Sequence, residues 1–178
     1  MKMKSNIRKT IFSALFLALA FIIPFFTGHA PQINSMLCPM HIPIFLCGFI
    51  CGWSWGLCVG LCAPILRSFI FGLPVFFPTA LCMAFELATY GAIVGILYKL
   101  LPKKIPFIYI SLCVSMIAGR VIRALATALC CGFSETGFSL SAFMSSVIIY
   151  AIPGMILHII IVPLIIIAAK KTNIIKES

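Results

Sequence analysis

Charged side chains are scarce in this 178-residue sequence, and acidic ones are nearly absent. Asp and Glu together number three, and charged residues make up 9% of the chain. A soluble globular domain carries about 25% charged residues, so this composition excludes a water-soluble fold. Hydrophobic residues account for 63% of the chain, and its mean hydropathy is +1.22. We therefore expect an integral membrane protein that spans residues 1–178 as a single domain.

The sequence also lacks the motifs of common catalytic sites. It contains no G-x-x-x-x-G-K-[ST] phosphate loop, no H-E-x-x-H motif, no G-x-S-x-G motif and no paired acidic motif. We therefore expect no enzyme activity, no cofactor and no metal site. If ATP drives this protein, another subunit has to hydrolyse it.

The hydrophobic runs predict an all-α, polytopic membrane protein. Open strands cannot satisfy their backbone in hydrocarbon, and the alternating pattern of a membrane barrel is missing. Runs bounded by Gly, Pro or charged residues give six expected transmembrane helices, at 10–27, 40–52, 54–71, 77–98, 106–130 and 140–169.

Basic residues predict the orientation, because Lys and Arg in short loops stay on the cytoplasmic side. Ten of the thirteen lie in the N-terminal tail, in the 99–104 loop and in the C-terminal tail. The loops at 28–39, 72–76 and 131–139 contain none. We therefore expect both termini to be cytoplasmic. These short clusters lack the basic face of a nucleic-acid binder, so no nucleic-acid partner is expected.

The second expected span is unusually short. The residues from His41 to Gly52 rise roughly 18 Å as a helix, whereas the hydrocarbon core is about 30 Å thick. The preceding segment, 28–40, contains two prolines and several polar residues. We interpret it as a lid loop between the first two helices that dips into the outer half of the membrane. Asn34 and His41 either contact a ligand from this lid or are ordinary polar loop residues.

Four charged residues, Arg67, Glu86, Arg120 and Arg123, lie inside apolar spans. A charge inside the bilayer is costly, so such residues usually face a cavity or one another and mark a functional site. All four fall in the expected outer half, and the spacing of Arg120 and Arg123 places them on one helix face. With Glu86 neutralising one arginine, the set has a formal excess of +2.

This excess predicts an outward-facing pocket for a small organic anion, since guanidinium groups pair with carboxylates and phosphates. The alternative is that one or two arginines reach the outer interface while Glu86 only fixes helix packing. Arg67, the shallowest, either lines the pocket or reaches that interface. Tyr90, one turn from Glu86, either orients the carboxylate, contacts a ligand or bonds a backbone carbonyl. We interpret His158 as a packing or interfacial residue in the inner half of the last span.

Small residues spaced four apart predict close helix packing in lipid. Most of these seams, such as Gly56 and Gly60, are expected within the chain. Ala14 and Ala18 in the least polar first span are the best candidates for docking another protein's helix.

The first span contains an A-x-x-x-A motif, and it is followed by the run from His41 to Gly52 and by later Gly, Pro, Glu86 and Tyr90-Gly91 positions. Together these features resemble the substrate-binding S components of energy-coupling factor (ECF) vitamin transporters. The resemblance implies a high-affinity binder of a vitamin or related micronutrient in a prokaryotic cell membrane. It also implies a transmembrane coupling subunit (T component) and two ABC ATPase subunits as partners. Ala14 and Ala18 would then dock the coupling subunit, and the ligand would contact Glu86, Tyr90, Arg120 and Arg123 under the lid.

The arginine excess favours an anionic vitamin, pantothenate- or folate-like, over a cationic one. Two other functions stay open at this point. One is a stand-alone, proton-coupled secondary carrier that uses Glu86, and the other is an intramembrane enzyme that uses Glu86 with Arg120 or Arg123.

Overall fold

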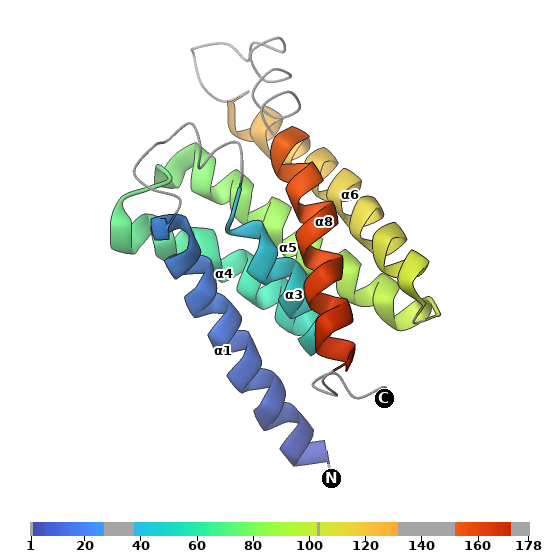
Figure 1. Cartoon of the computed structure of the whole chain (residues 1–178). Coiled ribbons are helices and arrows are strands. Elements are labelled where there is room, and N and C mark those ends of the chain that lie inside the picture. The colour runs from blue at the N-terminus through green and yellow to red at the C-terminus, as the bar shows by residue number, and fades with distance from the viewer. Residues whose placement is uncertain (1, 27–37, 103, 132–151, 172–178) are drawn as a thin grey trace.

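The computed structural model describes residues 2–26, 38–102, 104–131 and 152–171 of the chain. Within these residues every regular element is a helix, and five helices are long and apolar enough to cross a membrane, with one shorter apolar helix beside them. In chain order they are α1 (Lys2–Phe26), α3 (His41–Cys51), α4 (Trp53–Phe71), the short turn η1 (Phe76–Ala80), α5 (Leu81–Leu100), α6 (Ile105–Cys131) and α8 (Ile152–Lys171) (Figure 1).

The helix boundaries follow the apolar runs of the sequence closely in the middle of the chain. α4 coincides with the expected span 54–71 apart from one residue at its start, and α6 extends the expected span 106–130 by one residue at each end. α1 begins at Lys2, earlier than expected, because no Gly or Pro interrupts the helix there. α8 overlaps the second part of the expected span 140–169, and the first part lies outside the described residues.

The prediction of a short second span is confirmed. α3 contains 11 residues, which rise roughly 16 Å. It packs against α1, α4, α5 and α8, and most of its side chains are buried. Protein therefore surrounds α3 on most sides, which is the environment that a helix too short to cross lipid requires. Most of the expected lid lies outside the described residues.

The closest helix packing lies between α4 and α5. A Cβ atom at Gly91 would overlap the backbone of Gly56, and one at Gly60 would overlap the backbone of Leu87. The small residues of α4 thus form a seam within the chain, as their spacing predicts. α5 also packs against α3 and α6, so it is the central helix of the bundle (Figure 1).

Three basic segments of the sequence share one end of the bundle. The start of α1, the connection between α5 and α6 and the end of α8 lie at the lower side of Figure 1. The polar residues of α5 discussed below lie nearer the opposite end, since Glu86 is in the second turn of that helix.

Candidate functional site

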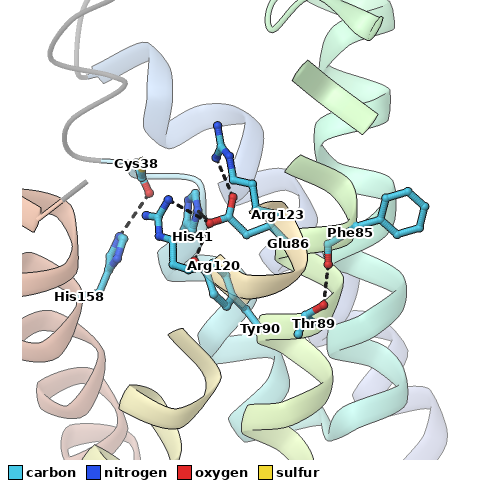
Figure 2. A network of polar contacts seen from close by, with 9 residues as sticks. All are labelled: Cys38, His41, Phe85, Glu86, Thr89, Tyr90, Arg120, Arg123 and His158. Atoms are coloured by element: carbon cyan, nitrogen blue, oxygen red, sulfur yellow. Dashed lines mark hydrogen bonds and ion pairs between the residues drawn. The ribbon is translucent and has the colours of Figure 1, made fainter. Parts of the chain in front are cut away.

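The polar centre of the bundle is Glu86, whose side chain is completely buried on α5. Its Oε2 accepts a hydrogen bond from Arg123 Nη1 at 2.7 Å, and Arg120 Nη1 lies 3.2 Å from Oε1 (Figure 2). Tyr90 donates its hydroxyl hydrogen to Oε1 at 2.6 Å. One carboxylate therefore holds two guanidiniums and a phenol in a single network, which we call the Glu86 network.

The two arginines reach Glu86 because they lie three residues apart on α6, and α6 packs against α5. The prediction that Arg120 and Arg123 share a helix face is confirmed. A carboxylate buried without a partner costs several kcal/mol, and two close cations offset that cost. The pairing explains how an acid can lie at the centre of an apolar bundle.

The position of the Tyr90 ring in this network depends on a glycine of the neighbouring helix. Its spacing from Glu86 brings the hydroxyl next to the carboxylate, one turn along α5. On α6, a Cβ atom at Gly119 would overlap the Tyr90 ring. The absence of a side chain at Gly119 therefore makes room for the ring. The sequence interpretation did not single out this glycine, and its only signal is its place beside Arg120.

His41, the first residue of α3, lies against the same carboxylate with only 1% of its side chain exposed. Its Nε2 is 4.0 Å from Glu86 Oε1, which is too long for a hydrogen bond. Neither ring nitrogen has a hydrogen-bond partner among the described residues. Buried polar atoms are rarely left in this state, so the ring marks a place where another polar group would be stabilised.

Aromatic rings enclose His41. The Tyr90 ring lies 5.4 Å away, and the His158 ring lies 5.5 Å away and nearly parallel, at 17°. Phe45, one turn along α3, approaches both Tyr90 and His158, at 4.9 and 5.8 Å between ring centroids. Side chains from α3, α5 and α8 thus meet beside the Glu86 network.

His158 is a second buried histidine beside this network. It lies in the second turn of α8, in the half of the helix away from Lys170. The start of the span expected at 140 lies outside the described residues. The His158 side chain is buried, and its Nε2 donates a hydrogen bond to the Cys38 carbonyl oxygen at 3.3 Å. An ionisable residue within an apolar span was the available signal, the same one that identified Glu86.

The Glu86 network carries a net positive charge. Two guanidiniums and one carboxylate leave a formal charge of +1 when the histidines are neutral. Burial, together with the nearby Glu86 charge, raises the pKa of the Cys38 thiol, so that thiol stays protonated and contributes no negative charge. The other two acidic residues of the chain, Glu135 and Glu177, lie outside the described residues.

The members of the network differ in accessibility. Arg120 and Arg123 keep 15% and 22% of their side-chain surface exposed, whereas Glu86 has none exposed and Tyr90 has 1%. The arginines are therefore the members that another molecule can reach. Glu86 and Tyr90 lie behind them and hold them in position.

Two of the expected site residues have no contact with this cluster among the described residues. Arg67 lies half-buried on α4, and no ion pair between it and Glu86 occurs in the described part of the chain. Among the described residues two arginines pair with Glu86, which gives this network a charge of +1. A role for Arg67 in the pocket or at the interface stays a prediction. Asn34 lies outside the described residues.

The expected docking pair lies on the outer surface of α1. Ala14 and Ala18 are both exposed, next to exposed Ile11 and Leu15. The opposite face of α1 packs inward, where Phe16 is buried in the core. The alanines therefore lie on a face that the described part of the chain leaves uncovered.

A comparison with protein families identifies the kind of protein that holds this network. The family described as "ECF transporter, substrate-specific component" matches residues 8–166. The chain belongs to this family. The comparisons with curated proteins and with solved structures gave no match.

Membership of the ECF substrate-specific components makes this protein a subunit of a transporter and places it outside the enzyme families. Its apolar helices agree with a membrane location. In the residues that the structure describes, no group of three or more His, Cys, Asp or Glu side chains is arranged to hold a metal ion.

Proposed function

We propose that this protein is the membrane-embedded substrate-binding subunit of an ECF-type ABC importer, and that it captures a small anionic vitamin or related micronutrient from outside a prokaryotic cell. A transmembrane coupling subunit and two ABC ATPase subunits would then deliver the molecule inward. The observation that carries the proposal is the Glu86 network, in which two partly exposed arginines remain in excess over one buried acid.

The residues of the network take different roles in this proposal. Arg120 and Arg123 contact the anion, because they alone combine positive charge with exposed surface. Glu86 and Tyr90 position the two guanidiniums. Arg67 has no ion pair with Glu86 among the described residues and stays a candidate either for the pocket or for the outer interface. Asn34 stays a lid candidate from the sequence alone.

The orientation follows from the basic segments. With both termini in the cytoplasm, the end of the bundle that carries the lysines faces inward and the Glu86 network lies toward the outside. The six spans of this topology include α3, which is surrounded by protein and does not need to cross the membrane alone.

The exposed face of α1 around Ala14 and Ala18 is proposed to dock the coupling subunit. Small residues allow another helix to approach closely in lipid, where packing drives association. The exposure of both alanines supports this role. A fully buried pair would have excluded it.

Binding of candidate anions to the purified protein in lipid nanodiscs tests the proposal directly. Pantothenate and folate are the first probes, measured by isothermal titration calorimetry. Arg120→Ala and Arg123→Ala should weaken binding by roughly 2–5 kcal/mol, because each leaves part of a buried charge network unpaired. Unchanged affinity in both variants would remove the two arginines from the binding site.

Uptake into proteoliposomes separates the proposal from a proton-coupled carrier that uses Glu86. The protein alone should bind but scarcely transport, whereas addition of the coupling subunit, the ATPases and ATP should start uptake. Transport by the protein alone that collapses with the proton gradient would support the carrier instead. Chemical conversion of the bound probe, seen by mass spectrometry, would support an intramembrane enzyme.

A further inference from the structure

Hydrogen-bonding capacity remains on both arginines after Glu86 is satisfied. Each guanidinium has five N–H donors, and the ion pairs to Glu86 involve Nη1 in both cases. Arg120 Nε is buried and has no hydrogen-bond partner among the described residues. Unused donors on a network with a charge of +1 favour one additional negative group.

A second unsatisfied group lies within reach of the same place. Arg120 Nη1 and His41 Nε2 approach the same oxygen, Glu86 Oε1, at 3.2 and 4.0 Å (Figure 2). Both nitrogens of the His41 ring lack hydrogen-bond partners in the part of the chain that the structure describes, and a neutral imidazole offers one donor and one acceptor. One small molecule can therefore meet the arginines with one group and His41 with another.

We propose that the cargo of this site is a monocarboxylate with a single negative charge, and that it also carries an amide or hydroxyl group that pairs with His41. Its carboxylate takes the remaining donors of Arg120 and Arg123. The inference rests on the proposed function and narrows the substrate to one charge class and one pair of recognition groups.

The charge of the network selects this class. One negative charge brings the buried site to neutrality, a neutral molecule leaves it at +1, and a dicarboxylate takes it to −1. An unbalanced charge is costly where water is excluded. A phosphate monoester carries a charge of about −1.5 to −2 at neutral pH, so it also leaves the occupied site with a net negative charge. A planar carboxylate additionally matches the geometry of the guanidinium.

A matched pair of probes isolates the carboxylate. Pantothenate has one carboxylate, one amide and two hydroxyls, and panthenol replaces only the carboxylate by an alcohol. Wild-type protein in nanodiscs should bind pantothenate at least about 100-fold more tightly than panthenol. In Arg120→Gln and Arg123→Gln the network has no net charge, so this ratio should fall at least about tenfold. Damage to folding affects both probes and cancels from the ratio.

The same two probes, pantothenate and panthenol, isolate the role of His41. His41→Phe keeps an aromatic ring beside Tyr90 and His158 but removes both nitrogens. It should weaken pantothenate and panthenol equally, by about tenfold, because both carry the amide and hydroxyls. The ratio between the two probes should stay at its wild-type value.

Panthenol bound as tightly as pantothenate, or folate with its two carboxylates bound more tightly, would overturn the monocarboxylate assignment and leave the proposed function intact. Wild-type affinity for both probes in His41→Phe would overturn the role of His41. If wild-type protein binds none of the three probes, the pantothenate- or folate-like substrate of the proposed function is itself wrong, and this inference falls with it.

Discussion

α6 and α1 both carry pairs of residues whose spacing predicts a shared functional face, yet the two faces turn in opposite directions. Arg120 and Arg123 on α6 turn inward and meet Glu86. Ala14 and Ala18 on α1 turn outward and are exposed. Lipid tolerates alanine but not an unpaired guanidinium, so polarity decides which face has to find a partner inside the chain.

Because of this difference, we expect substitutions in the two regions to have different effects. The Glu86 network joins α5 and α6 by charge, so the loss of one member leaves the others unpaired inside the bundle. The proposed docking of another helix on the α1 face around Ala14 and Ala18 depends on close packing, so added bulk should disrupt it. Four substitutions test this contrast.

The largest effect is expected from Glu86→Gln. It leaves two guanidiniums in the bundle without a counter-charge and should lower the free energy of unfolding by about 3–5 kcal/mol. Denaturant titration in nanodiscs or mild detergent measures the loss. Thr89→Val is the matched control on the same helix, since the Thr89 hydroxyl donates a hydrogen bond to the Phe85 carbonyl of its own helix and takes no part in the Glu86 network. Equal stability of the two variants would contradict a structural role for the ion pairs.

Gly119→Ala should destabilise the protein by about 1–3 kcal/mol, because the new methyl group overlaps the Tyr90 ring. The direction of the change in the free energy of unfolding is informative, since Gly→Ala at an unconstrained helix position stabilises by about 0.5–1 kcal/mol. A double-mutant cycle with Tyr90→Leu checks the cause. If the overlap with the ring is responsible, the double variant should lose less stability than the sum of the single variants.

Ala14→Trp should weaken assembly with the coupling subunit at least tenfold, or about 1.4 kcal/mol, and leave pantothenate binding unchanged. Co-purification and titration with the coupling subunit measure it. Ile117→Trp places the same side chain at an exposed position of α6 and should leave assembly intact. Normal assembly of Ala14→Trp would show that the docking face lies elsewhere.

The smallest effect is expected from Tyr90→Phe, which removes one hydrogen bond to Glu86 Oε1. That oxygen keeps its ion pair with Arg120, so the loss of stability should be about 1 kcal/mol. The same unfolding measurement applies. A loss as large as that of Glu86→Gln would mean that the phenol, and not the arginines, maintains the network.

Much of the site could be predicted from single residues in apolar surroundings. Glu86, Arg120 and Arg123 stand out because each is costly in lipid, and helical spacing places the two arginines together. The same reasoning does not assign a role to Arg67, since cost in lipid does not say which neighbour offsets it. It also does not identify the neighbours of His158, which lie on other helices.

Contacts between distant segments were beyond the sequence argument. His41 and His158 lie 117 positions apart and stack only because α3 and α8 pack together. Gly119 matters only because the Tyr90 ring of another helix lies over it. No periodicity within one helix contains this information.

The sequence alone determined that this chain is helical and membrane-embedded, that its second span is short, and which few residues carry charge inside it, because these properties follow from local composition and from the energetics of lipid. Only the tertiary structure decided that one acid holds two arginines, and that His41, without a hydrogen-bond partner among the described residues, lies against the same carboxylate. Those outcomes depend on how helices pack against one another, and packing sets the distances over which charges and hydrogen bonds act.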